Sequence, residues 1–574
     1  MHPSASASAA LASWRTTLVL LAVTALAAVV VLPILRFPQL DPDDYRYLRL
    51  VSDLRAGRVG LLDACIIENR WDHLWWVDCT SVVRFFRPTL MLSYALDVSV
   101  HGGTAFGLLA SNGLLYLATC LLAALLFLRL LPGIVPPLAA ALAFTGCACH
   151  AETIWYVAGR NETLLALGFV GALLCHTARG RWRWLALPCY AFALASKELA
   201  LPLPLLAWVL DRLLLHRPPD ARRTDRLLLL GYALLAGLYL GARHLVLARA
   251  GGSDLVYPYF VAPSRPDFVQ HLWLQLRTYS ENLLLAGITP PFMRPDQQAE
   301  RVTAFGTALG LAVPLLLVAW LRRERALWWF LLLALVTWLP ASVVYISERY
   351  LFLPSLAVAG TFGLALARAH RHRGIWIACG IVYLAWLSQQ SRWLYFKNRY
   401  IIEATNEPIA IEEKLRAMAE QLPPAQPIYL LNFPGGTFSA QFAEDLVRVV
   451  LADPTRQVRV LTVLPEDRSL PTRTEVRRVG DRAVAVHGQP LLMQHSRWLF
   501  PWTRLETGQR TERPRLDFAV EVLDGDGERC RALRFDLPQA LAEAVFLRFS
   551  LPPASGPVPL GELVRHGSLD RLRP

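Results

Sequence analysis

Long apolar runs follow one another along the first two thirds of the chain. Eleven of them are about as long as the 17 to 25 residues that an α-helix needs to cross a bilayer. They comprise residues 14–35, 104–131, 134–149, 163–177, 182–196, 199–215, 227–247, 302–321, 326–344, 350–367 and 375–393. The pattern predicts a polytopic α-helical membrane protein with about eleven transmembrane helices.

The connections between these runs differ in charge. If the N-terminus is cytoplasmic, the cytoplasmic connections are residues 129–133, 179–183, 211–226, 322–325 and 368–373, and each carries arginine. The short connections on the other side, residues 149–160, 196–198 and 347–349, hold little positive charge. Since positive residues stay inside, we expect the loop before residue 90, residues 251–301 and everything after Trp393 to lie outside.

Composition agrees with this topology. The 574 residues are 54% hydrophobic, and the formal net charge of +13 comes from cations that lie between the apolar runs. We therefore expect a lipid bilayer as partner and no nucleic acid. Arginine supplies all but three of the 58 basic residues, a bias that suggests a GC-rich bacterial genome. The expected location is the bacterial inner membrane, with an uncleaved first span.

The pattern changes after the last apolar run. Strand-like segments at residues 428–431, 458–463, 483–486, 516–522 and 545–549 accompany a helix-like segment at 440–451. We predict two domains: a membrane domain, residues 1–397, with a first periplasmic loop at 36–89, and a soluble periplasmic α/β or α+β domain, residues 398–574. The second domain resembles no family, so both acceptor recognition and a structural cap remain open for it.

The first loop is rich in tryptophan. Trp71, Trp75 and Trp76 are of the type that favours the membrane interface, so we expect amphipathic helices along the outer leaflet. Cys65 and Cys79 also lie in this loop. They would form a disulfide in an oxidising compartment or remain two unpaired thiols, and the sequence does not decide between these states.

Four polar clusters lie at the predicted outside ends of spans. They are Asp41, Asp43 and Asp44; His150, Glu152 and Arg160; Lys197 and Glu198; and Glu348 and Arg349. Each has an ordinary explanation: a solvated turn, a lysine neutralised by its neighbour, or an arginine that snorkels to the interface. Taken together they suggest a site, because charged groups at membrane depth are costly and usually pair or bind a ligand.

The chemistry of these groups fits transfer of a sugar from a lipid phosphate. A carboxylate can take the proton of an acceptor hydroxyl, and cations can stabilise the departing phosphate. Lys197 offers a compact charge, and the fork of Arg349 suits phosphate oxygens. No metal is then required, although Asp43 and Asp44 could hold Mg²⁺ or Mn²⁺ if the donor carried a diphosphate.

At these motifs the chain resembles the GT-C integral-membrane glycosyltransferases, especially protein O-mannosyltransferases and the membrane part of transmembrane tetratricopeptide-repeat mannosyltransferases. The resemblance covers residues 14–393 and includes no tetratricopeptide repeats. It is carried by Asp43-Asp44, Arg87-Pro88 with Ser93 and Asp97, His150-Ala151-Glu152, Gly159-Arg160-Asn161-Glu162, Ser196-Lys197-Glu198 and the stretch from Ser347 to Ser355.

The resemblance implies an inverting glycosyltransferase that uses a polyprenyl-phosphate sugar, with Asp43 or Asp44 as the general base. The acceptor would be a glycan, a lipid or a protein. We expect the other candidate residues to fall into two groups. Those that bind the lipid phosphate are Lys197, Arg349, Arg87 and Glu348, and those that shape the pocket are His150, Glu152, Arg160 and Glu198.

Two other classes remain open at this stage. A transporter or lipid flippase would also have many spans, but such proteins often show paired halves with polar residues at the membrane midplane. Here no halves are visible, and the polar clusters share one surface. An O-antigen polymerase or ligase would likewise combine many spans with a large outside loop. The acidic cluster so early in the chain favours the first interpretation.

Overall fold

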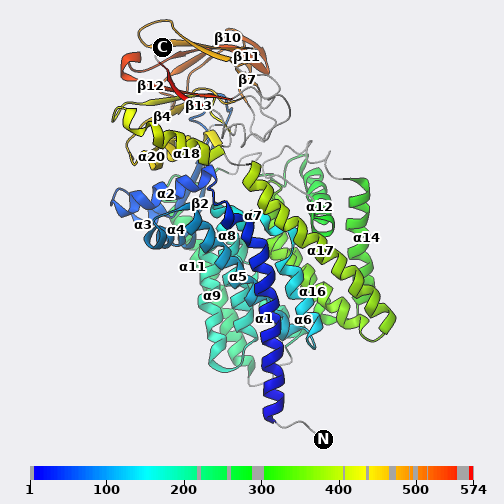
Figure 1. Cartoon of the computed structure of the whole chain (residues 1–574). Helices are drawn as coiled ribbons and strands as arrows, with labels where there is room; N and C mark the ends of the chain where they lie inside the picture. The colour runs from blue at the N-terminus through cyan, green and yellow to red at the C-terminus, as the bar shows by residue number, and fades with distance from the viewer. Residues whose placement is uncertain are drawn as a thin grey trace.

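A bundle of long apolar helices forms the lower part of the molecule in the computed structural model (Figure 1). The structure describes residues 5–79, 81–215, 221–254, 260–286, 303–404, 407–434, 439–464, 473–489, 491–494, 502–513, 515–551 and 568–572. Within these ranges seven helical segments are long and apolar enough to cross a membrane. They are Trp14–Arg36, Ala105–Leu130, Val157–Thr177, Arg223–Arg249, Ala304–Leu321, Arg325–Val343 and Glu348–Ala369.

All eleven predicted spans contain a helix. Seven correspond to the long segments, whose helices are α1 (Ala5–Arg36), α5 (Ala105–Leu130), α8 (Arg160–Thr177), α11 (Ala221–Arg249), α14 (Ala304–Leu321), α15 (Arg325–Trp338) and α16 (Phe352–Ala369). The other four contain the shorter helices α6 (Val135–Thr145), α9 (Ala186–Ser196) and α10 (Leu203–Leu213) and the long α17 (Arg373–Ala404). The predicted class, a polytopic helical membrane protein with a further C-terminal domain, is confirmed.

Burial differs strongly between the helices. The most apolar windows of α8 and α16 are 83% and 78% buried, whereas that of α11 is 11% buried. α8 packs against α5 and α9, and α16 packs against α6 and α15. α8 and α16 therefore form the centre of the bundle, and α11 presents an apolar surface of the kind that lipid covers.

The first loop folds into a small structured layer at one end of the bundle. It contains α2 (Pro42–Arg55), the short α3 (Leu61–Ala64) and an antiparallel hairpin of β1 (Ile66–Arg70) and β2 (Val82–Phe86), which pairs Ile66 with Phe86. α4 (Pro88–His101) follows and leads into α5. Cys65 and Cys79 are free thiols in the structure.

Two sheets build the C-terminal domain. The mixed sheet has the order β13 (Ser568–Leu572), β12 (Val545–Ser550), β3 (Ile428–Leu431), β4 (Val458–Val460), in which β12, β3 and β4 are parallel. The second sheet is antiparallel and contains β5 (Arg473–Arg478), β6 (Ala483–Gln489), β7 (Met493–Gln494), β8 (Leu505–Glu506), β9 (Arg510–Thr511), β10 (Ala519–Gly527) and β11 (Arg529–Asp536). Helices α18 (Glu407–Met418) and α20 (Ala443–Val450) lie between these sheets and the bundle (Figure 1). The exact domain boundary stays a prediction, and α17 runs through residue 397 without a break.

The C-terminal domain sits on the first loop, at the end of the bundle away from the N-terminus (Figure 1). The indole of Trp75 donates to the carbonyl of Leu461 at 2.8 Å, and Trp76 packs on Trp502 with ring centroids 6.0 Å apart. Trp71, Trp75 and Trp76 are at most 2% exposed. The expectation that these tryptophans lie at the lipid interface was therefore wrong, because their apolar area is buried against protein instead.

Candidate active site

The acidic cluster forms the first turn of α2. Asp41 is the N-cap, Pro42 is the first helical residue, and Asp41 and Asp44 form a capping box. Asp43 and Asp44 thus lie where free backbone N–H groups and the helix dipole favour negative charge. The sequence Asp-Pro-Asp-Asp is a helix start signal, so local chemistry places both aspartates in the first turn of α2.

Asp44 is fully engaged by protein groups. Its Oδ1 accepts from the Tyr94 hydroxyl at 2.7 Å and from the backbone N–H of Ala158 at 2.8 Å, and its Oδ2 accepts from the N–H of Asp41 at 2.9 Å. The side chain is fully buried. Burial raises the pKa of Asp44 to about 7, although the three donors oppose the shift. Asp44 therefore joins α2 to α4 and to the turn before α8.

Asp43 differs from its neighbour. Its Oδ2 accepts a hydrogen bond of 2.5 Å from the Tyr156 hydroxyl, but its Oδ1 has no hydrogen-bond partner among the residues that the structure describes. Burial raises the pKa of Asp43, while the Arg46 guanidinium and the Tyr156 hydroxyl partly offset this effect. Asp43 lines the large cavity described next, and Asp44 is not among its lining residues. The two carboxylates therefore have different environments.

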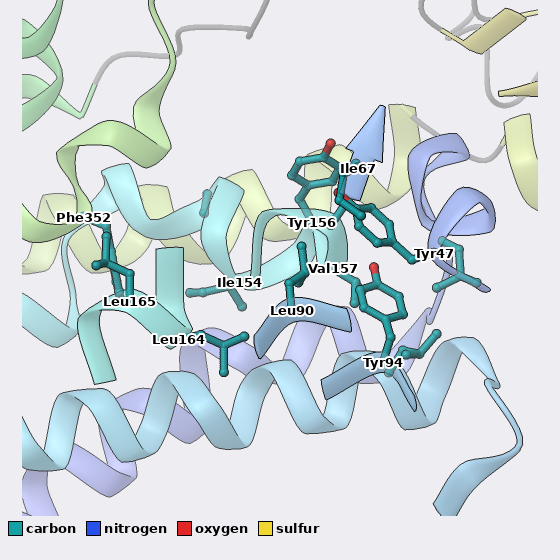
Figure 2. Close-up of a cluster of buried hydrophobic side chains, with 14 of the residues drawn as sticks. Tyr47, Ile67, Leu90, Tyr94, Ile154, Tyr156, Val157, Leu164, Leu165 and Phe352 are labelled. Carbon is teal, nitrogen blue, oxygen red and sulfur yellow. The ribbon is translucent and has the colours of Figure 1, made fainter. Parts of the chain in front are cut away.

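A cavity of about 530 Å³ lies between the first loop, the bundle and the C-terminal domain. Its walls come from segments far apart in the sequence. Five of the ten predicted site residues line it: Asp43, Arg87, Lys197, Glu198 and Arg349. The aromatic side of this region is visible in Figure 2, where the rings of Tyr47, Tyr94 and Tyr156 lie close together. Tyr47 stacks on Tyr94 with centroids 4.9 Å apart, and Tyr47 and Tyr156 also line the cavity.

Carboxylates hold two of the cavity cations in place. Arg87 forms an ion pair of 2.5 Å with Glu198, and Lys197 pairs with Glu162. The Nζ of Lys197 also lies 4.6 Å from the centre of the Tyr350 ring. The side chains of Arg87, Lys197 and Glu162 are at least 94% buried, and that of Glu198 is 31% exposed. Their positions are therefore fixed before any ligand binds.

Aromatic rings surround the third cation, Arg349. Its guanidinium lies within 5.7 Å of the ring centres of Tyr156, Tyr345 and Tyr350. Glu152 holds the segment: it accepts from the Ser347 hydroxyl at 2.6 Å and from the Arg349 N–H at 3.2 Å. The same carboxylate is 3.4 Å from the Arg349 guanidinium. Glu152, predicted to shape the pocket, is thus placed behind Arg349.

Two of the remaining predicted residues lie away from the cavity lining. Arg160 is 1% exposed and pairs with Asp97 at 2.6 Å, and its guanidinium lies 5.3 Å from the centre of the Tyr94 ring. His150 is fully buried between the Tyr116 hydroxyl at 3.1 Å and the Ser355 hydroxyl at 2.8 Å. Arg160 supports the tyrosine that binds Asp44, and His150 packs the turn before α8.

Glu348 also lies away from the lining residues. It forms two short contacts with Lys397, of 2.7 and 2.9 Å, and both side chains are at most 6% exposed. The Glu348 carboxylate therefore neutralises the ammonium group of Lys397 in α17 and does not face the cavity cations. Its predicted part in phosphate binding gains no support from its location.

Several cavity residues were not singled out from the sequence. Tyr156 and Tyr345 follow no motif that distinguishes them from interfacial aromatics. Arg243 in α11 lines the cavity, and its Nε has no hydrogen-bond partner within the described ranges. An arginine inside an apolar span was a detectable signal, since such a residue usually has a functional partner. Gln441 of the C-terminal domain also lines the cavity, and nothing in the sequence predicted it.

Protein donors already contact most of the carboxylate oxygens at the start of α2. Both oxygens of Asp44 and one oxygen of Asp43 accept hydrogen bonds. A divalent ion shared by both residues would have to compete with these donors, so the reaction proposed below uses no metal. Ligand atoms of Cys147, Cys149 and His150 lie within 4.8 Å of one another, but both nitrogens of His150 already contact hydroxyl groups.

No family model matches the sequence, and no curated protein is significantly similar to it. Solved structures with a similar chain path include ArnT from Cupriavidus metallidurans bound to undecaprenyl phosphate, at 14% identity and a TM-score of 0.39 over 78% of this chain and 90% of that one. The oligosaccharyltransferase of Archaeoglobus fulgidus is similar in its apo form, at 12% identity and a TM-score of 0.45 over 77% of this chain and 64% of that one. Its complex with Zn and sulfate gives 12% identity and a TM-score of 0.42 over 76% and 62%.

What the fold and site define is a polytopic helical membrane protein with a buried, cation-rich cavity beneath a C-terminal domain. Among its lining residues are the cations Arg84, Arg87, Lys197, Arg243 and Arg349 and the carboxylates Asp43 and Glu198. An excess of cations beside a partly unsatisfied aspartate favours an anionic ligand.

Proposed function

We propose that the protein is a membrane glycosyltransferase that moves a sugar from a polyprenyl-phosphate donor to an acceptor hydroxyl, with inversion. The observation that carries this proposal is the meeting of Asp43 with Arg87, Lys197 and Arg349 in one cavity. The resemblance of the sequence motifs to GT-C enzymes supports the same reaction. By the charge pattern of the connections, we place the cavity and the C-terminal domain at the periplasmic face of a bacterial inner membrane.

In this mechanism Oδ1 of Asp43 takes the proton of the acceptor hydroxyl. The acceptor oxygen then forms a bond to the anomeric carbon, and the bond from that carbon to the phosphate oxygen breaks. The leaving polyprenyl phosphate carries away the bonding electron pair, and the cavity cations stabilise its charge. The Tyr156 hydroxyl holds Oδ2 at 2.5 Å, so that Oδ1 is the oxygen available for the proton.

The test is a donor panel. Purified full-length protein in lipid nanodiscs is incubated with polyprenyl-phosphate sugars that differ in the sugar, with a detergent-like alkyl glycoside as acceptor, and release of bare polyprenyl phosphate is followed by mass spectrometry. We expect release with at least one donor and a rate lower by about a hundredfold or more with Asp43→Asn. Absence of release with every donor, or equal release by the variant, would count against the proposal.

Arg243 is expected to contribute to donor binding. Its guanidinium is not tied to a carboxylate in the described part of the chain, and α11 carries it to the cavity from the lipid-facing side of the bundle. A charged hydrogen bond contributes about 1.5 to 3 kcal/mol. Arg243→Gln should therefore raise the donor KM about tenfold or more with a small change in kcat. The measurement is steady-state kinetics over a donor concentration series.

Arg249→Gln is the matched control for Arg243→Gln. It changes the same residue type at the end of the same helix, where the side chain is exposed and outside the cavity lining. Its donor KM should equal that of the wild type. Equal KM values for all three proteins would show that Arg243 does not meet the phosphate.

The pH dependence of the reaction should report on Asp43. Burial raises the pKa of Asp43, so its base form is lost at a higher pH than that of a free aspartate, whose pKa is about 3.9. As pH falls through the raised pKa, kcat/KM should fall with it. Tyr156→Phe removes a donor that favours the charged form of Asp43, and should therefore move this acid limb to higher pH. An acid limb at the same pH in both proteins would contradict the assignment of Asp43 as base.

A further inference from the structure

The C-terminal domain supplies part of the cavity wall. Gln441 and Phe442, in the turn before α20, are among the lining residues. Gln441 is 4% exposed, and its side-chain Oε1 has no hydrogen-bond partner among the described residues. A buried carboxamide oxygen without a partner costs free energy, about 1 to 3 kcal/mol, unless a ligand or water satisfies it. Gln441 is therefore a buried acceptor at the edge of the cavity.

Arg46 fixes the position of Gln441 relative to α2, the helix that carries Asp43. Arg46 lies one turn after Asp43 in α2, and its Nη2 donates to the backbone carbonyl of Gln441 at 3.4 Å. The Nε of Arg46 pairs with Asp445 at 3.0 Å, and the guanidinium lies 4.5 Å from the centre of the Phe442 ring. Gln441 is thus held close to the helix that carries Asp43.

The same guanidinium reaches the first loop. Its Nη1 donates to the Glu68 carbonyl at 2.6 Å and to the Asn69 side-chain oxygen at 2.9 Å. Asn69 and Trp71 line the cavity beside the two residues of the C-terminal domain. A wall that combines carboxamides with aromatic rings suits a sugar ring, whose hydroxyls need hydrogen bonds and whose C–H faces need apolar contact.

We propose that Gln441 accepts a hydrogen bond from a hydroxyl of the carbohydrate that sits against Asp43, so that the C-terminal domain completes the sugar-binding site. This inference rests on the proposed function and extends it to a residue outside the GT-C-like part of the chain. The hydroxyl belongs either to the donor sugar or to a sugar acceptor, since both must come within reach of Asp43. Asp445 acts through Arg46 and is a positioning residue.

The experiment compares Gln441→Ala with the wild type in nanodiscs, using the donor found active in the panel. One arm measures sugar release to water without an acceptor, and the other measures transfer to octyl glucoside. Loss of one hydrogen bond to a sugar hydroxyl should lower kcat/KM about tenfold. A loss in both arms assigns the bond to the donor sugar, and a loss with octyl glucoside alone assigns it to the acceptor.

Gln509→Ala is the control, because Gln509 lies near β9 in the second sheet, outside the cavity lining. Kinetics within twofold of the wild type in both arms for Gln441→Ala would overturn the inference, provided that Asp43→Asn remains inactive. If Asp43→Asn is fully active as well, the proposed function fails with it. Equal thermal stability of Gln441→Ala and the wild type would exclude a general folding defect as the cause of a loss.

Discussion

Asp43→Asn is expected to lower the rate of sugar transfer by about 10²- to 10⁴-fold, the usual contribution of a general base. The substitution keeps the size and shape of the side chain but removes its ability to take a proton. In the structure Asp43 lines the cavity, and its Oδ1 has no hydrogen-bond partner in the part of the chain that the structure describes. The measurement is kcat for transfer at saturating donor, in nanodiscs, with protein concentration corrected for the folded fraction.

The controls for this prediction come from other aspartates. Asp63→Asn changes an exposed aspartate in the same loop, and should leave kcat unchanged. Asp44→Asn removes an acceptor that holds three donors, so its main effect should be lower stability. A kcat within twofold of the wild type for Asp43→Asn would refute the assignment. A large loss confined to Asp44→Asn, in folded protein, would move the role of base to Asp44.

The membrane helices were predictable because their signals are local, and so were five of the eleven strands that the structure describes in the C-terminal domain: β3, β4, β6, β10 and β12. An apolar run of membrane length and a period-two alternation each depend on neighbouring residues alone. β3 coincides with the predicted strand at residues 428–431. The first loop was less predictable, since Trp71 and Trp75 have the composition of an interfacial segment whether lipid or protein covers them.

The residues of the candidate site also fall into two groups: those that a local signal in the sequence predicts and those that only tertiary contacts bring to the cavity. The sequence identified Asp43, Lys197 and Arg349 because charge at the end of an apolar span is conspicuous. It did not separate Asp43 from Asp44, since the difference depends on Tyr94 and Tyr156, which come from distant segments. Gln441 was out of reach for the same reason: its position in the cavity results from docking of the C-terminal domain through Arg46.

The second large effect is expected on stability, from loss of the buried ion pair between Glu348 and Lys397. The pair between Glu348 and Lys397 joins the start of α16 to α17, and both side chains are at least 94% buried. Removal of one partner from a buried ion pair leaves an uncompensated charge and costs about 3 to 5 kcal/mol. Lys397→Met should therefore lower the unfolding free energy by about that amount. Equilibrium unfolding in mixed micelles, followed by far-UV circular dichroism, gives the value.

The double variant Lys397→Met/Glu348→Gln should recover most of this loss, because it removes both charges together. Arg477→Met serves as the control: Arg477 pairs with Glu475 on the surface, with its side chain 69% exposed, and such pairs contribute at most about 1 kcal/mol.

Comparison of the single variants with the double variant also decides the role of Glu348. If Glu348→Gln alone raises the donor KM without lowering stability, Glu348 belongs to the phosphate site after all. If it lowers stability and leaves KM unchanged in the folded protein, the carboxylate serves to keep Lys397 paired, and the lipid phosphate is left to Arg87, Lys197, Arg243 and Arg349.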